Sequence, residues 1–259
     1  MFTAPKIPAT NSPGRRPAVT MRFLARMLTA AVLGTLAVAV GQPATAAPAP
    51  AEAFAPAPAE AVEVTAQVET QLTAAARKTV ALTFDDGPSK YTPQVLDILK
   101  RYKVKATFCI LGQNVGTYRK AAQRIVREGH RLCNHSWNHP DFTDLSNSSA
   151  RSQVVRTQNK IDAVTGRTPK VFRFPYGSSN ARTRTVVRNQ GLRILGWTVD
   201  TKDWSRPGAK TIENRAVNNT RPGAVILMHD GGGNRSQTVA ALDDIIRRLK
   251  AKGYTFVLA

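Results

Sequence analysis

The 259-residue sequence is poor in cysteine, in histidine and in acidic side chains. It contains 2 Cys and 4 His, and its 17 Asp or Glu are outnumbered by 37 Lys or Arg, which gives a formal net charge of +20. It lacks a P-loop and a dinucleotide-binding fingerprint, so nothing in it supports a nucleotide cofactor. Its apolar runs fall short of the ~20 residues that a membrane-spanning helix needs. The sequence is therefore a strongly basic chain whose few histidines and acidic clusters are candidate functional groups.

The N-terminal segment has the layout of a secretory signal peptide. Arg22 and Arg26 precede an apolar stretch of 14 residues, and small residues follow up to Ala46. This order is typical of a cleaved signal, whereas a membrane anchor needs a longer apolar run. We therefore expect residues 1–46 to be removed, the protein to be secreted or associated with the cell envelope, and no stable membrane insertion to remain. Met21 is an alternative start of the chain.

The next segment, residues 47–77, has a strongly biased composition. It consists mostly of Ala, Pro, Glu, Thr and Val, and APAPAEAFAPAPAEA within it nearly repeats itself. Such a segment cannot bury a core, so it predicts a disordered, extended linker. The globular part should then be one domain, residues 78–259.

This domain is basic even without the preceding segments. Residues 78–259 carry 31 Lys or Arg and 13 Asp or Glu, a formal net charge of +18. Such a charge favours an anionic neighbour, which for an exported protein is an acidic wall polymer rather than nucleic acid. No basic run exceeds two residues and no aromatic residues interleave with basic ones, so the patterns of nucleic-acid binding are missing. A diffusely basic, solvated surface is the alternative.

Export would carry the two cysteines, Cys109 and Cys133, into an oxidising compartment, where they could pair. Two buried free thiols are the alternative. Spacing alone says nothing about geometry, so the sequence leaves the disulfide open.

Short apolar segments alternate with amphipathic ones along the domain. Strands are expected at 79–84, 104–111, 130–135, 171–174, 193–197, 224–229 and 254–258, and helices at 92–102, 114–129, 148–166, 181–190, 211–220 and 236–252. The alternation predicts βαβ units and a parallel sheet: an α/β fold, with a (β/α) barrel of about seven strands. Polar clusters follow the strands, and the carboxyl ends of the strands are where such a barrel gathers its active site.

Two adjacent carboxylates, Asp85 and Asp86, end the first predicted strand. Adjacent side chains on a strand point to opposite faces, but a turn at the strand end relaxes this rule. One carboxylate can then bind a metal ion while the other faces a substrate. Ordinary turn chemistry for the sequence Asp-Asp-Gly-Pro is the alternative.

Two histidines, His135 and His139, follow the third predicted strand. Imidazoles four residues apart can reach one ion from a single turn, as they do on one face of a helix. Two His and one Asp leave coordination positions open for water, which a catalytic metal requires. A pair of surface histidines is the alternative, but it does not explain the carboxylates at the neighbouring strand end.

Three further clusters each follow a later strand. Taken singly, they could be a packed loop, a surface corner and a satisfied core histidine. Five such clusters in one order indicate a single site instead. The three are Arg173-Phe174-Pro175-Tyr176-Gly177, Asp200-Thr201-Lys202-Asp203-Trp204 and Leu227-Met228-His229-Asp230. We expect only a supporting role for Asp200.

Together the five clusters resemble the five motifs of polysaccharide deacetylases with a NodB homology domain, carbohydrate esterase family 4. The resemblance covers about residues 78–259. It implies a distorted (β/α) barrel with fewer than eight strands, and we expect a monomer. Cys133 and Phe174 depart from the family's pattern, but neither stands at a ligand position.

The resemblance implies roles for the residues around the metal and the base. Asp85 is similar to the catalytic base, and Arg173 to the arginine that orients it. Asp86, His135 and His139 are similar to the metal ligands.

The same resemblance implies roles around the leaving group. His229 is similar to the general acid, and Asp203 to the carboxylate that tunes it. The backbone N–H of Tyr176 is similar to the oxyanion donor, and Trp204 and Leu227 would line the pocket for the acetyl methyl group.

These inferences predict a secreted, metal-dependent hydrolase that removes N-acetyl groups from N-acetylglucosamine residues of peptidoglycan or chitin-like glycans. One divalent metal ion is expected, and the His, His and Asp set suits zinc, although it also suits other divalent ions. Removal of O-acetyl groups from acetylxylan is the alternative that the same motifs would serve. A non-catalytic carbohydrate-binding protein is a further alternative, against which the intact motif residues argue.

Overall fold

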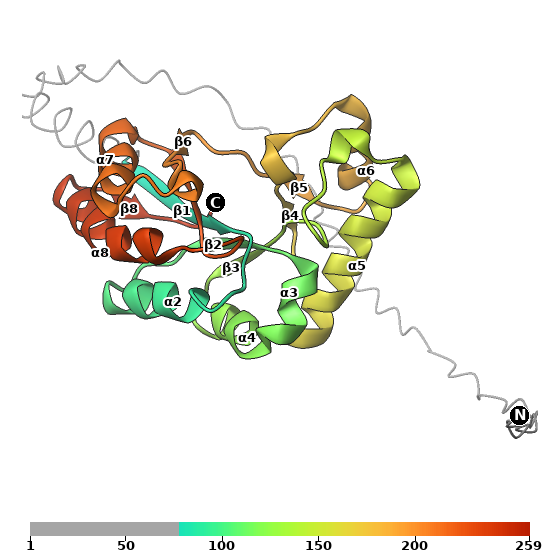
Figure 1. Cartoon of the computed structure of the whole chain (residues 1–259), viewed down its shortest axis with the longest axis horizontal. Helices are drawn as coiled ribbons and strands as arrows, with labels where there is room; N and C mark the ends of the chain where they lie inside the picture. The colour runs from blue at the N-terminus through green and yellow to red at the C-terminus, as the bar shows by residue number, and fades with distance from the viewer. Residues whose placement is uncertain (1–77) are drawn as a thin grey trace, which may run out of the picture. The chain divides into compact units, whose positions relative to one another are not determined.

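A parallel sheet forms the centre of residues 78–259, the part of the chain that the computed structural model describes (Figure 1). The hydrogen-bonded order is β5-β4-β3-β2-β1-β7-β6, and β8 also pairs with β1. Within the described residues the outer strands β5 and β6 do not pair, so the sheet is an incomplete barrel. This confirms the distorted (β/α) barrel. The strands are β1 Thr79–Asp85, β2 Thr107–Ile110, β3 Arg131–Asn134, β4 Val171–Phe172, β5 Arg193–Ile194, β6 Val199–Asp200, β7 Ala224–His229 and β8 Thr255–Phe256.

Helices connect the strands and cover the sheet (Figure 1). None of those described is long and apolar enough to cross a membrane. The predicted signal peptide and linker lie outside the described residues. The helices are α2 Thr92–Arg101, α3 Gly112–Thr117, α4 Arg119–Arg127, α5 Asn147–Thr165, α6 Ala181–Arg188, α7 Ala209–Asn219 and α8 Ser236–Ala251, with 3-10 turns η1 Phe142–Asp144, η2 Pro175–Gly177 and η3 Asp203–Ser205.

Two predicted elements differ from the structure. The single helix expected at 114–129 is two helices, because the backbone leaves the helical region at Tyr118, where φ is −106° and ψ is 39°. The strand expected at 193–197 ends at Ile194, and the chain passes to β6 without a helix. The apolar Trp197 suggested a longer strand, but its side chain lines a pocket instead.

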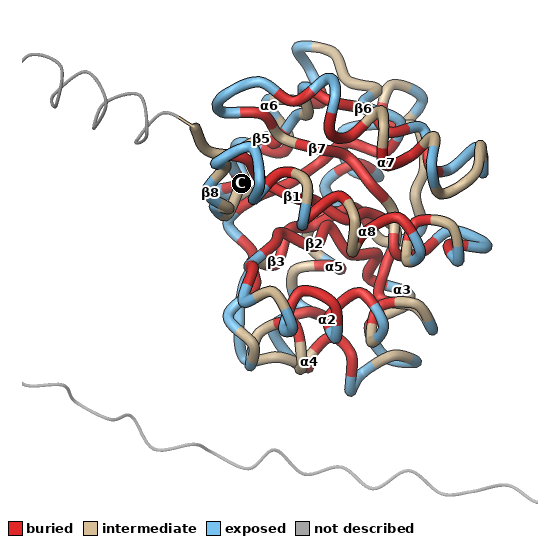
Figure 2. Tube along the Cα trace, turned by 90° about the vertical axis from the view of Figure 1, so that its left-hand side faces the viewer, coloured by how far each residue is buried: buried red, intermediate tan, exposed pale blue. Residues whose placement is uncertain are grey.

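The core lies on both faces of the sheet, as expected for parallel strands covered by helices (Figure 2). Every residue of β1 after Thr79 is buried. Phe84 of β1 stacks on Phe108 of β2 with ring centroids 5.2 Å apart. This packing fixes the end of β1 against β2. Asp85, the last residue of β1, directly follows Phe84.

The structure settles the pairing of the cysteines. Cys109 of β2 and Cys133 of β3 are opposite each other in the strand register, with Cα atoms 4.2 Å apart, and form a disulfide. The bond links two neighbouring strands just before the loop that carries His135.

Candidate active site

The predicted clusters meet in one pocket at the carboxyl ends of the strands. The pocket has a volume of about 400 Å³. Of the predicted site residues, only Arg173 and Asp203 do not line it, because both are buried behind its wall. The lining residues are Asp85, Asp86, His135, His139, Phe174, Tyr176, Gly177, Trp197, Asp200, Trp204, Leu227 and His229.

Asp86, His135 and His139 form a compact set of possible metal ligands. One atom from each can be chosen so that all three lie within 4.8 Å of one another. The Nε2 atoms of His135 and His139 lie 3.5 and 3.4 Å from Oδ1 of Asp86. Ligands of a tetrahedral zinc ion, ~2.0–2.2 Å from the metal, lie roughly 3.4 Å from one another. The spacing therefore suits three donors that share one divalent cation.

Hydrogen bonding supports the same interpretation. Oδ1 of Asp86 is buried and has no hydrogen-bond partner among residues 78–259. Nδ1 of His135 lies 2.8 Å from the carbonyl oxygen of Arg173, which can only accept, so Nδ1 carries the proton. The lone pair of His135 is then on Nε2, facing Asp86. Metal-binding histidines are commonly fixed in this way by the other ring nitrogen.

The two histidines reach this place from a loop and not from a helix. Ser136 and His139 have φ angles of 72° and 64°, so the turn that brings the two histidines together is not helical. The loop is held by the hydrogen bond from the His139 N–H to Oγ of Ser136 (3.0 Å). Asp86 has a φ of 69°, and this turn brings it into the same pocket as the preceding Asp85.

Buried Arg173 holds Asp85. Its Nη1 donates to Oδ1 of Asp85 and to Oγ1 of Thr83, both at 2.8 Å, and its Nη2 donates to the carbonyl oxygen of Gly196 at 2.8 Å. Arg173 is fully buried. The other carboxylate oxygen of Asp85 lies 3.7 Å from Nε2 of His135. The pair thus fixes one oxygen of Asp85 and leaves the other beside the possible metal position.

Partly buried His229 and buried Asp203 form a second pair at the pocket. Oδ1 of Asp203 accepts from Nδ1 of His229 at 2.7 Å, and Oδ2 accepts from the His229 backbone N–H at 2.8 Å. Oγ1 of Thr238 also donates to Oδ2 at 2.7 Å. This arrangement fixes the imidazole ring and leaves its Nε2 for the pocket.

The pairing shifts the pKa values on this side of the pocket. Burial alone would lower the pKa of His229, but the hydrogen bond and charge of Asp203 outweigh it and raise the pKa above its ordinary value. Burial alone would raise the pKa of Asp203, but His229 and Thr238 outweigh it and lower the pKa. His229 is therefore suited to carry a proton near neutral pH.

The possible ligands titrate differently. Burial alone would raise the pKa of Asp86, but contact with His135 and the charge of the other histidines outweigh it and hold the pKa far below its usual range. Burial would lower the pKa of His135, but the charges of Asp85 and Asp86 raise it overall. Burial and the neighbouring His135 lower the pKa of His139. An ionised Asp86 and a neutral His139 are the forms that bind a cation, and a metal would displace the proton on His135.

Aromatic side chains form the walls of the pocket. Tyr176 and Trp204 are 72% and 54% exposed, so both stand at its mouth. The Tyr176 ring packs edge-on against His139, with centroids 4.4 Å apart. Trp197 lies near the Arg173 guanidinium, 5.6 Å from the ring centroid, and Leu227 is buried in the wall.

Sequence reasoning missed several residues that support the site. Trp197, Asn114 and Thr238 belong to other elements than the five clusters, and Asn114 donates to the backbone oxygen of Asp86 at 3.0 Å. Gly231 and Gly232 pack so closely on Asp86 that a Cβ at either position would collide with it. Only the Gly-Gly pair directly after the last motif gave a usable signal, since glycines in a loop permit close backbone approach.

Comparison with known proteins identifies the family. The family model named polysaccharide deacetylase matches residues 73–195. A peptidoglycan-N-acetylglucosamine deacetylase of Bacillus cereus (strain ATCC 14579) is 42% identical over 180 residues, covering 69% of this chain and 66% of that protein. The chain thus spans just under two thirds of this curated relative.

Solved structures agree with this match. A peptidoglycan N-acetylglucosamine deacetylase in complex with 4-naphthalen-1-yl-N-oxidanyl-benzamide is 40% identical, with a TM-score of 0.68 and coverage of 70% of this chain and 86% of that one. A carbohydrate esterase family 4 pseudoenzyme from Bacillus anthracis is 34% identical, with a TM-score of 0.66 and coverage of 70% and 64%. This chain belongs to the polysaccharide deacetylase family, which confirms the resemblance seen in the five motifs.

Proposed function

We propose that this protein is a divalent-metal-dependent deacetylase that hydrolyses the N-acetyl group of N-acetylglucosamine residues in peptidoglycan or chitin-like glycans. One observation carries the proposal: the ligand set Asp86, His135 and His139 shares a pocket with two separate buried pairs. These pairs are Asp85 with Arg173 and His229 with Asp203. A base and an acid on either side of one cation site are the parts that hydrolysis of an amide requires.

A cation bound by the ligand set supplies Lewis acidity, which lowers the pKa of water and polarises a carbonyl group. We favour zinc, because two imidazoles and one carboxylate are ligands that it prefers. Asp85 accepts the proton of the attacking water, and Arg173 orients Asp85 through the hydrogen bond to its Oδ1. The backbone N–H of Tyr176 donates to the oxygen that gains negative charge. One such donor is worth ~3 kcal/mol.

The leaving group needs the second buried pair. An amine leaves poorly unless it is protonated, so His229 donates a proton to the sugar nitrogen as the carbon–nitrogen bond breaks. Asp203 holds His229 in the right orientation and favours its protonated form. Trp204 and Leu227 enclose the acetyl methyl group.

The acid also bears on the choice between amide and ester. An alkoxide leaves more easily than an amine, so an ester depends less on a proton donor. The raised pKa keeps His229 protonated near neutral pH, so a donor is in place for an amine, which favours N-acetyl over O-acetyl substrates; the basic surface favours an anionic wall glycan. The Bacillus cereus relative is itself named for peptidoglycan N-acetylglucosamine.

Acetate release from peptidoglycan, a chitin oligomer and acetylxylan, measured side by side, tests this function. We expect a higher kcat/KM on the two N-acetylated glycans than on acetylxylan. The ratio of these kcat/KM values reports how well the site stabilises the transition state for an amine and for an alkoxide leaving group. A ratio that favours acetylxylan would make the protein an esterase with the same residue roles. No acetate from any of the three would make it a non-catalytic binding protein.

We further propose that the protein acts outside the cytoplasm. The proposal rests on the basic, apolar and small-residue pattern that ends at Ala46, and on the Ala/Pro-rich segment that follows it. Mass spectrometry of the mature protein from culture medium and envelope fractions tests it. An N-terminus at Ala47 is the expected result, and retention of the apolar segment would contradict it.

A further inference from the structure

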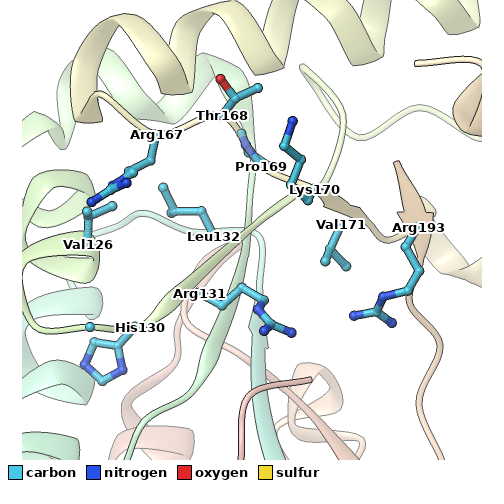
Figure 3. A pocket seen from close by; sticks show the side chains of 11 residues that line it. Val126, His130, Arg131, Leu132, Arg167, Thr168, Pro169, Lys170, Val171 and Arg193 are labelled. Atoms are coloured by element: carbon cyan, nitrogen blue, oxygen red, sulfur yellow. The ribbon is translucent and has the colours of Figure 1, made fainter. Parts of the chain in front are cut away.

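A second large cavity lies at the opposite end of the sheet from the active site. It has a volume of about 620 Å³ and lies where β3, β4 and β5 begin (Figure 3). All strands of a parallel sheet run in the same direction, so their amino ends lie at one end of the sheet and their carboxyl ends at the other. The catalytic residues follow the carboxyl ends, and the cavity lies at the amino ends. We call this cavity the basic cleft, because its polar lining consists of His130, Arg131, Arg167, Thr168, Lys170 and Arg193.

Three cations of the basic cleft lack counter-charges within the described residues. None of the lining residues is acidic. Arg167, Lys170 and Arg193 are exposed and make no ion pair with any residue from 78 to 259. Arg131 donates to an oxygen of the C-terminal residue Ala259, and Thr168 at the rim donates to Asp162 at 2.8 Å. What distinguishes the three cations is that they line one cavity together.

The sheet spaces these cations regularly. Arg131 begins β3 and Arg193 begins β5, while Lys170 immediately precedes β4, which lies between them. Neighbouring strands are ~4.8 Å apart, so the three positions span about 10 Å. The Arg131 and Arg193 side chains point toward one another across Val171, whereas Lys170 extends from the other side of the segment (Figure 3). A row of cations on two sides suits a chain of anions better than one small ion.

One histidine of the lining is buried and does not take part in the proposed binding. Nδ1 of His130 accepts a hydrogen bond from the Ala106 backbone N–H at 3.1 Å, so Nε2 carries the ring proton. The ring is 7% exposed and packs edge-on against Phe108, with centroids 5.5 Å apart. The charged side chains of the cleft therefore carry the proposal.

We propose that the basic cleft binds a polymer whose repeating units carry phosphodiester groups, and so holds the domain on a polyanion without entering the reaction. Arginine guanidinium groups bind phosphate oxygens in pairs. Each phosphodiester carries a negative charge and two non-bridging oxygens that accept from guanidinium and ammonium groups, and a polymer presents such charges one after another, as the amino ends of the strands present Arg131, Lys170 and Arg193. A cavity of 620 Å³ at the end of the sheet has room for more than one such unit.

Binding of end-labelled poly(glycerol phosphate) to the full chain, followed by fluorescence anisotropy at several salt concentrations, tests this proposal. The cleft variant R167Q/K170Q/R193Q removes three charges, and the single variant K170Q removes one. The control R119Q/K120Q/R151Q removes three exposed charges from the N-terminal parts of α4 and α5, which lie toward the other end of the sheet. Acetate release from a neutral chitin oligomer checks that each variant is folded.

We expect the cleft variant to weaken binding at least ~10-fold and to flatten its salt dependence, K170Q to weaken it a few-fold, and the control to stay within about 3-fold of the native chain. All variants should keep the native rate on the neutral oligomer. Equal losses in the cleft variant and the control would show a diffuse charge effect and overturn the proposal. Equally tight binding of poly-glutamate would overturn the phosphate assignment. If inorganic phosphate displaced the labelled polymer at the same total concentration of phosphate groups, the cleft would be a site for a single ion, and the proposal of polymer binding would be overturned.

Discussion

At the carboxyl ends of the strands the charged side chains are buried and paired, whereas at the amino ends the basic side chains are exposed and face no counter-charge. Arg173 and Asp203 are almost completely buried, and each is fixed by several hydrogen bonds. Lys170 and Arg193 at the other end have no such partners among residues 78–259. Buried pairs fix geometry and shift pKa values, so single substitutions there should be severe. Exposed cations act additively and are screened by salt, so single substitutions there should be mild.

The sharpest test of this contrast uses one histidine from each end. His139→Ala removes a proposed metal ligand, and we expect loss of metal and a fall in turnover beyond the ~10- to 100-fold that an outer partner costs. His130→Ala removes a buried ring far from the ligand set, so it should lower stability but leave most of the deacetylase activity and the metal content of the folded protein. Metal content and acetate release of the two variants check this. Equal losses would show that the ligand set is wrongly assigned.

The next largest effect concerns the two adjacent carboxylates. Asp85→Asn keeps the shape of the side chain but removes the proton acceptor, so we expect a ~10²- to 10⁴-fold fall in kcat with metal content near normal. Asp86→Asn should lose metal instead. Metal analysis of both variants separates the roles, and loss of metal from the Asp85 variant would exchange them.

A smaller effect is expected at the glycine that packs on the ligand carboxylate. Gly232→Ala places a Cβ against Oδ2 of Asp86, and we expect metal affinity to fall ~10- to 100-fold. Gly191→Ala is a matched control, because its φ of 71° is close to the 69° of Gly232 but no atom lies within 4 Å of the added Cβ. Metal titration should be normal for the control. Equal losses would mean that backbone strain, and not the contact with Asp86, is responsible.

A further expected effect, measured on the pH axis, is a shift of the pH profile of kcat. His229 must be protonated to act as an acid, and Asp203 raises its pKa above the ordinary value of 6.5. Activity is therefore retained below that raised pKa and lost as pH rises through it. Asp203→Asn removes the charge that raises the pKa, so the alkaline limb of kcat should move to lower pH, with a reduced maximum. A limb that stays in place would show that another group titrates.

Much of the fold and site could be predicted, because they depend on patterns of residues that are close together in the sequence. The alternation of strands and helices predicted the parallel barrel, and the family's motifs predicted residues that converge in one pocket. The roles assigned to those residues stay predictions.

Features that depend on tertiary contacts could not be predicted. Thr238 reaches Asp203 from α8, and Trp197 reaches Arg173 after a strand shorter than its apolar sequence suggests. The disulfide of Cys109 and Cys133 follows from the register of β2 and β3, which spacing does not give. The non-helical turn of His135 and His139 could not be predicted either, because four-residue spacing does not distinguish a helix from a loop with left-handed residues.

Stoichiometric metal reconstitution of the full chain tests the central claim most directly. The protein is freed of metal with a chelator, and Zn²⁺ is added back in steps while acetate release from a chitin oligomer is followed. The account predicts negligible activity without metal and a linear rise to a plateau at one equivalent per chain, because Asp86, His135 and His139 form one site. Full activity of the metal-free protein would contradict it.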